Sequence, residues 1–256
     1  MNINNFDTIK MKWLSFCYFF IFTTLISAQQ PEVVISAGHT DFISSITMSS
    51  DGKWIASGSI DKSVKIIDAA SGKELRTFGG HNQRIQSVQF DPTNRYISSY
   101  VEGESIYIYD VISGNLIANF PSERSEYYFL NEPNTLLFVN KESNICKANY
   151  LTNEVTFTSD FSFVTNISLS PTDQSIVFAY TVQGELMKFD LKTKSILFKS
   201  NPFNGYKFQT CPMKCSNDGN FLALAHDGAV NGKDWQLTVF STKDILSYLD
   251  FNFSLI

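Results

Sequence analysis

The sequence predicts an all-β chain built from repeated four-stranded sheets, and three observations carry this prediction. The 256 residues are rich in types that favour strands, with 23 Phe and 11 Tyr. Short apolar stretches that alternate with a period of two are separated by polar turn sequences. The whole pattern repeats about every 40 residues, which is typical of repeat architectures. Hydrophobic residues make up 43% of the chain, with 13 Gly and 7 Pro, which excludes collagen-like and disordered classes.

Residues 1–28 are predicted to be a secretory signal peptide. Lys10 and Lys12 precede an apolar stretch over 13–26, and Ser27 and Ala28 supply small side chains at the expected cleavage point. This stretch is shorter than the roughly 20 apolar residues of a membrane span. We therefore expect an exported protein whose residues 29–256 do not insert into the membrane once the signal is removed. An uncleaved membrane anchor is the alternative.

The charge balance and the cysteines exclude further classes. A formal net charge of -5 and a pI near 5.2 argue against general nucleic-acid binding, which needs a basic face. Cys211 and Cys215 are four residues apart, which on an extended strand separates their Cα atoms by about 13 Å. That distance is too long for a disulfide, so we expect these two cysteines to be small buried hydrophobic residues rather than a bridge or a metal pair.

The clearest repeat joins the segments that begin at Gly38 and Gly80, which align without a gap. Positions that recur include His39 and His81, Ser57 and Ser99, and Asp68 and Asp110. Within the first unit the alternation predicts four strands, at Ile43–Met48, Trp54–Ser59, Val64–Asp68 and Leu75–Phe78. Because one such sheet leaves both its faces unburied, we expect the sheets to stack around an axis.

The later units are weaker. We place five units at about 38–79, 80–120, 121–158, 159–200 and 201–241. The third lacks the opening Gly-His pair, and the fifth carries an insertion around Gly228–Lys233 that we expect to protrude as a loop.

The first unit resembles the WD40 repeat family. The matching residues are Gly38-His39, Asp51-Gly52, Ala56-Ser57-Gly58-Ser59, Asp61 and Asp68, with Ile67 where the family has Trp. The resemblance implies a β-propeller of four-stranded blades, about five of them recognisable, in which a His, a Ser or Thr, an Asp and a Trp form a hydrogen-bonded tetrad in each blade.

By this resemblance, structural blade residues are His39, Ser57 and Asp61 in the first unit and His81 and Ser99 in the second, together with Asp68 and Asp110. In the second unit Gly103 stands for the Asp and Tyr109 for the Trp. Family propellers usually have seven blades, so we expect an incomplete ring and a chain that is a piece of a longer protein. A closed five-bladed ring and edge-to-edge self-association are the alternatives.

The sequence predicts no catalytic, cofactor-binding or metal-binding residues. Gly-rich phosphate loops are absent, and His39 and His81 lack partners at metal-ligand spacing. The segment around Cys211 weakly resembles the nucleophile motif of caspase-like peptidases, but no His upstream of it lies at the position of the expected base. His226 is expected in a surface turn. Asn166 and Asn252 begin Asn-x-Ser sequons.

A partner-binding rim is the main functional hypothesis. In a blade of this kind the residues just before the first strand lie at the rim of the central opening, which here places Asp41, Phe42, Gln83 and Arg84 there. An exposed Phe beside an Arg is typical of a protein-binding hot spot. We therefore expect an exported, non-catalytic scaffold for protein partners. The alternative is the N-terminal sensing propeller of a larger exported enzyme, such as a caspase-like peptidase, truncated here.

Overall fold

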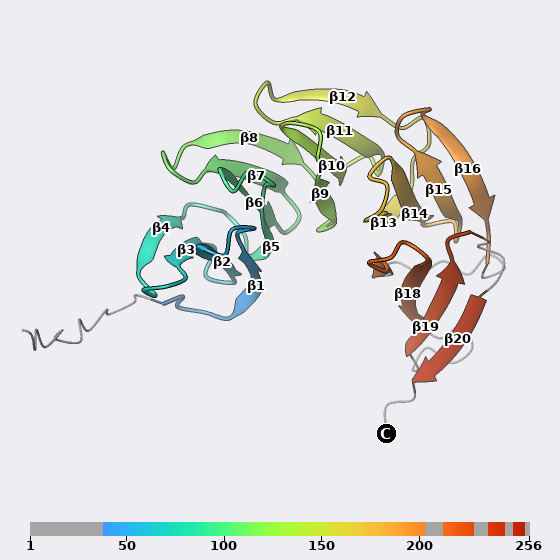
Figure 1. Ribbon diagram of the computed structural model, residues 1–256, viewed down its shortest axis with the longest axis horizontal. Helices are drawn as coiled ribbons and strands as arrows, with labels where there is room; N and C mark the ends of the chain where they lie inside the picture. Colours follow the sequence, from blue (N-terminus) through green and yellow to red (C-terminus); the bar gives the residue numbers. More distant parts are fainter. Residues whose placement is uncertain (1–37, 203–211, 228–234, 244–247, 254–256) are drawn as a thin grey trace, which may run out of the picture. The chain divides into compact units, whose positions relative to one another are not determined.

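The structure, a computed structural model, describes residues 38–202, 212–227, 235–243 and 248–253, and these form five four-stranded antiparallel sheets (Figure 1). In each sheet the strands lie side by side in chain order. No helix occurs among the described residues, so no segment in that part of the chain is a helix long and apolar enough to cross a bilayer.

The strand bounds show the repeat directly. The first sheet holds β1 Ile43–Met48, β2 Trp54–Ser59, β3 Val64–Asp68 and β4 Glu74–Phe78. The second holds β5 Ile85–Phe90, β6 Tyr96–Val101, β7 Ser105–Asp110 and β8 Leu116–Pro121. The third holds β9 Tyr127–Phe129, β10 Thr135–Val139, β11 Ile145–Asn149 and β12 Glu154–Thr158. The fourth holds β13 Val164–Leu169, β14 Ile176–Thr181, β15 Leu186–Asp190 and β16 Ser195–Ser200. The fifth holds β17 Met213–Cys215, β18 Phe221–Asp227, β19 Trp235–Ser241 and β20 Tyr248–Phe253.

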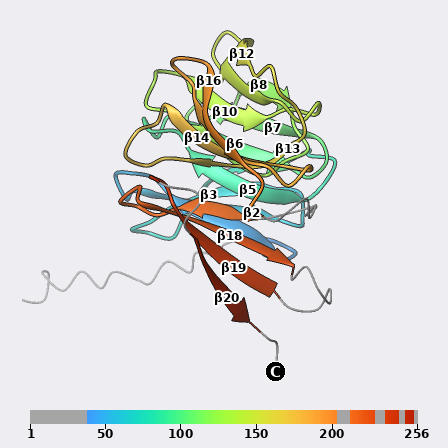
Figure 2. The ribbon, with the colours of Figure 1, turned by 90° about the vertical axis from the view of Figure 1, so that its right-hand side faces the viewer.

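The predicted strands of the first unit agree with the structure, except that β4 begins one residue earlier, at Glu74. The third unit, weakest in sequence, still forms a complete sheet. The fifth sheet extends past the expected boundary at residue 241, because β20 pairs with β19 from Trp235 to Phe240 (Figure 2). The expected loop at Gly228–Lys233 and Cys211 lie outside the described residues.

In several sheets, the last residue of the third strand accepts hydrogen bonds from backbone N–H groups of the turn that follows. Asp110 Oδ1 accepts hydrogen bonds from the backbone N–H groups of Ile112 (2.9 Å) and Ser113 (2.8 Å). Asp68 Oδ1 accepts from the backbone N–H of Ser71 at 2.7 Å. These bonds, with the one from Ser113 the largest influence, hold the pKa of Asp110 below its usual range. An acceptor side chain at this position therefore stabilises the turn by satisfying donors that the sheet leaves open.

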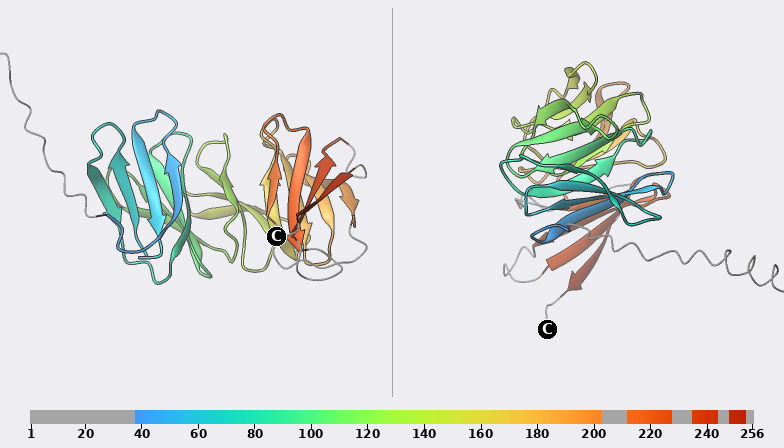
Figure 3. Two further views of the ribbon diagram at one scale, coloured as in Figure 1. Left: turned by 90° about the horizontal axis from the view of Figure 1, so that it is seen from below. Right: turned by 90° about the vertical axis from the view of Figure 1, so that its left-hand side faces the viewer.

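The hydrophobic core consists of four clusters, each shared by two consecutive sheets. The first cluster joins the first and second sheets through Ala56, Ile66, Ile85 and Val88, and equivalent clusters join the second to the third, the third to the fourth and the fourth to the fifth. Figure 3 shows the sheets following one another in chain order, with the blue first sheet beside the green second sheet.

No core cluster of described residues joins the fifth sheet to the first, so the expectation of an incomplete ring is confirmed. As a result, one face of the first sheet has no neighbouring sheet within the described ranges. On that face Ile46 and Met48 in β1 are 69% and 58% exposed. These apolar side chains would be buried if another sheet packed against this face.

Candidate functional site

The structure brings His39, Ser57 and Asp61 together. His39 Nδ1 donates to Asp61 Oδ2 at 2.9 Å, and Ser57 Oγ donates to His39 Nε2 at 2.8 Å. Burial acts to raise the pKa of Asp61, but the hydrogen bonds from Ser63, Thr40 and His39 outweigh it and hold that pKa well below its usual range. The three side chains thus connect the segment before β1 to β2 and to the turn that follows β2.

His81 is held differently. Its Nδ1 donates to the backbone carbonyl of Lys62 at 3.0 Å, so Nε2 is the acceptor. Tyr109 O–H donates to Nε2 at 2.9 Å, while Ser99 Oγ lies 3.4 Å away. Burial raises the pKa of Tyr109 to about 12, which keeps the phenol protonated. Tyr109 occupies the position at which the family has the tetrad Trp, and its hydroxyl contacts the imidazole of His81 directly.

Stability is expected to fall as the pH drops below the ordinary His pKa of about 6.5, because burial lowers the pKa of His81 in the folded state. The unfolded chain then binds the proton and the folded chain does not, so the contribution of His81 is present above about pH 6.5 and is lost as the pH falls. Urea unfolding at pH 7.5 and 5.5 should show a loss in free energy of unfolding of about 1 kcal/mol that His81→Gln abolishes. An unchanged pH dependence in His81→Gln would contradict this role.

His226 does not lie in a surface turn. It is 2% exposed and lies within β18, where its Nε2 is 3.0 Å from Thr238 Oγ1. The prediction was wrong because the strand continues to Asp227, pairing with β19 as far as Trp235. All three His of the chain are thus engaged within blades.

Other candidates for chemistry are also buried in the sheets. Cys146 and Cys215 are free, 1% and 5% exposed, and burial raises the pKa of each thiol, as expected for small hydrophobic residues. Asn166 is 5% exposed, so this sequon does not offer its amide to a glycosylating enzyme. Over the described ranges no group of His, Cys, Asp and Glu gathers in a way that would hold a metal ion.

The four predicted rim residues lie directly before β1 and β5, two strands that pack side by side. Phe42 is 78% exposed, and Asp41 and Gln83 are exposed. The Arg84 guanidinium makes two hydrogen bonds to the Glu102 carboxylate, with Nη2 donating to Oε1 at 2.6 Å. This bidentate pair fixes the orientation of Arg84 beside the start of β5.

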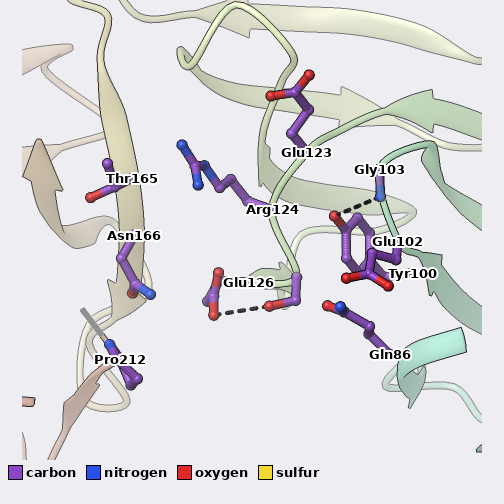
Figure 4. Close-up of a pocket in the computed structure, with 11 residues that line it drawn as sticks. Gln86, Tyr100, Glu102, Gly103, Glu123, Arg124, Glu126, Thr165, Asn166 and Pro212 are labelled. Atoms are coloured by element: carbon purple, nitrogen blue, oxygen red, sulfur yellow. Dashed lines mark hydrogen bonds between the residues drawn. The ribbon is translucent and has the colours of Figure 1, made fainter. Parts of the chain in front are cut away.

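A cavity of about 470 Å³ opens next to this ion pair, and we call it the rim pocket (Figure 4). It is formed where the inner strands of several sheets begin and the second strands end. Its lining residues are Gln86, Tyr100, Glu102, Gly103, Glu123, Arg124, Ser125, Glu126, Thr165, Asn166 and Pro212. None of the lining residues was predicted from the sequence; the nearest predicted rim residue is Arg84, which pairs with Glu102. The rim positions were predicted from the Gly-His pair, which is missing from the third and later units.

Two atoms in the rim pocket lack hydrogen-bond partners. Arg124 Nε, a donor, and Asn166 Oδ1, an acceptor, are both buried and unpaired, and only Ser200 Oγ shares this condition among the described residues. Leaving such a group unpaired costs about 1–3 kcal/mol, and native structures rarely do so without a reason. A ligand in the rim pocket could supply the missing acceptor for Arg124 Nε and the missing donor for Asn166 Oδ1.

Comparison with known proteins agrees with this architecture. A family model described as "WD domain, G-beta repeat" matches residues 31–68 and 72–110, and no curated protein matches the chain. Among solved structures, the β-propeller domain of Cps50 (Swd1) from Myceliophteria thermophila is similar, with a TM-score of 0.62 and 16% identity over 80% of this chain and 68% of that one. This likeness shows the fold alone. Propellers of this family are in general scaffolds for protein–protein interaction. The matched segments at 31–110 are WD40 repeats, and together with the five stacked sheets they support a WD40 β-propeller.

Proposed function

We propose that this chain is an exported scaffold that binds a protein partner at its rim and catalyses no reaction itself. The observation that carries the proposal is the rim pocket, in which Arg124 Nε and Asn166 Oδ1 are buried without partners. The exposed Phe42 and the fixed Arg84 lie at the starts of neighbouring inner strands, and aromatic and Arg side chains are the types enriched in interface hot spots. The signal-peptide pattern over 1–28 supports export.

The chemistry of the rim pocket favours binding over catalysis. Its lining offers carboxylates, amides, hydroxyls and one guanidinium, but neither His nor Cys. The imidazoles of His39 and His81 are occupied by hydrogen bonds within their blades.

Replacing Phe42 and Arg84 together by Ala is expected to reduce partner capture at least tenfold and to leave the melting temperature almost unchanged. Phe42 contributes little to folding because it is exposed, and solvent screens an ion pair as exposed as Arg84–Glu102, so that pair stabilises the fold only slightly. The measurement is photocrosslinking of the full chain in its own cells, with a photoreactive residue at Gln83, followed by mass spectrometry. The crosslinked chain should begin at Gln29 and occur in the exported fraction.

The matched control is Ile112→Ala with Lys53→Ala. These changes remove an aliphatic side chain that is 71% exposed and an ion-pair cation that is 72% exposed, against 49% for Arg84, at the opposite ends of the strands. The control should keep full capture. Equal loss in both double variants, or a large drop in melting temperature for the rim variant, would reject the rim as a binding surface. A chain that retains residues 1–28 would reject cleavage and support the membrane anchor.

A further inference from the structure

We propose that the rim pocket binds a Lys or Arg side chain of the partner, together with a neighbouring backbone carbonyl of the same peptide segment. This inference rests on the proposed function and specifies the chemistry of its site. Three features of the rim pocket carry it: an acceptor that needs a donor, an excess of negative charge, and a donor that needs a neutral acceptor.

The acceptor is Asn166. Its side chain projects from β13 into the rim pocket and faces Glu126 across it (Figure 4). The residue is 5% exposed, and its Oδ1 has no hydrogen-bond partner. The neighbouring hydroxyl of Thr165 is no substitute, because it donates to the backbone carbonyl of Tyr180 at 3.1 Å. Arg124 Nε does not donate to Asn166 Oδ1 either, since both atoms lack a partner. A donor from outside the chain, such as an ammonium or guanidinium N–H, would satisfy Asn166.

The charge of the rim pocket favours a cation over an anion. Glu102 is neutralised by its pair with Arg84. Glu123 and Glu126 also line the rim pocket, and neither forms an ion pair with any described residue. Against these two carboxylates stands one guanidinium, that of Arg124. A cationic group would therefore complete the charge balance, whereas a carboxylate or phosphate would be repelled by both glutamates.

The donor is Arg124. Figure 4 shows its side chain extending from the segment before β9 toward Thr165 and Asn166 on β13. Its buried Nε has no acceptor. Because the flanking carboxylates disfavour an anionic acceptor, a neutral peptide carbonyl is the group that fits. A basic residue in a peptide supplies both parts, a cation at the tip of its side chain and a carbonyl in its backbone. The volume of about 470 Å³ is within the range of ligand pockets.

The test uses short Gly-Ser peptides that differ only in one central residue: Arg, Lys, Gln or Glu. Saturation-transfer NMR with the full chain should rank the Arg and Lys peptides about tenfold tighter than the Gln peptide, with the Glu peptide weakest, because charged hydrogen bonds are about twice as strong as neutral ones. Glu126→Gln keeps the shape of the side chain and removes its charge. It should erase this preference, so that the Arg, Lys and Gln peptides bind with similar affinity. Arg124→Lys keeps the positive charge and replaces the Nε donor by a methylene group. It should weaken all four peptides together, since it removes the contact with the backbone carbonyl.

The control is Glu154→Gln, which removes an exposed carboxylate from the outer strand β12 and should change nothing. Binding of the Gln or Glu peptide as tight as that of the Arg peptide would overturn the proposal, and so would an unchanged preference in Glu126→Gln or no binding of the Arg peptide. The scaffold function is judged separately by crosslinking at Gln83. A crosslinked partner without any charge preference would reject the cation site and keep the scaffold.

Discussion

Replacing Phe178 by Ala is expected to lower the free energy of unfolding by about 3–5 kcal/mol and to loosen the fifth sheet before any other. Phe178 lies in β14, is 1% exposed, and packs in the cluster that joins the fourth sheet to Met213, Leu222 and Phe240 of the fifth. In a repeat protein each unit is stabilised only by its neighbours. Within the part of the chain that the structure describes, the fifth sheet shares a core cluster with the fourth sheet alone, so no second cluster there compensates for a cavity at this interface.

Hydrogen exchange of the full chain checks this expectation. Phe178→Ala should speed the exchange of backbone amides in β17–β19 far more than in β5–β7. The control is Phe221→Ala, which removes a Phe that is 51% exposed in β18 and should cost less than about 1 kcal/mol. Uniform loss of protection over all five sheets would show that they unfold as a single unit and would contradict the nearest-neighbour picture.

Replacing Gly58 by Ala is expected to lower the free energy of unfolding by about 1–3 kcal/mol. Gly58 lies in β2, where the first and second sheets pack against each other. A Cβ built at this position would lie 2.5 Å from Ile85 Cγ2 and 2.9 Å from Val88 Cγ1. Ile85 is fully buried, so it cannot move away without disturbing the core. Chemical denaturation of the variant and the native chain measures the difference.

A second substitution separates this clash from a general effect of Ala in a strand. Ile85→Ala alone creates a cavity and should destabilise by about 2–5 kcal/mol. In the double variant the new methyl group at position 58 enters that cavity, so the total loss should be smaller than the sum of the two single losses. Strict additivity would mean that the two side chains do not meet and that the packing argument is wrong.

Much of the fold could be predicted because local sequence features, namely alternating apolar residues and turn residues, mark the strands. The alternation in Ile43–Met48 and the turn at Asp51-Gly52 define β1 and β2 without any knowledge of the neighbouring sheets. β20 was missed because the insertion around Gly228–Lys233 makes the fifth unit longer than the 40-residue period. In the structure Tyr248–Phe253 pairs along its whole length with β19. His226 was misplaced for the related reason that strand length is set by the pairing partner.

The site was only partly predictable. Position within the repeat places Phe42 and Arg84 at the rim, since both precede the first strand of a unit. Nothing local marks Arg124 or Asn166, which are 42 residues apart and belong to different sheets. Their unpaired atoms become visible only once β13 is packed beside the segment that precedes β9.

The sequence by itself determined the all-β repeat, the four strands of the first unit and the residues that precede the inner strands of the first two units, because alternation and turn chemistry are local properties. The tertiary structure decided which contacts those residues make. Tyr109 contacts His81, Arg84 pairs with Glu102, and the rim pocket collects side chains from several sheets. These contacts depend on how the sheets stack, and stacking is fixed by the packing of buried side chains over long sequence separations, which no local pattern records.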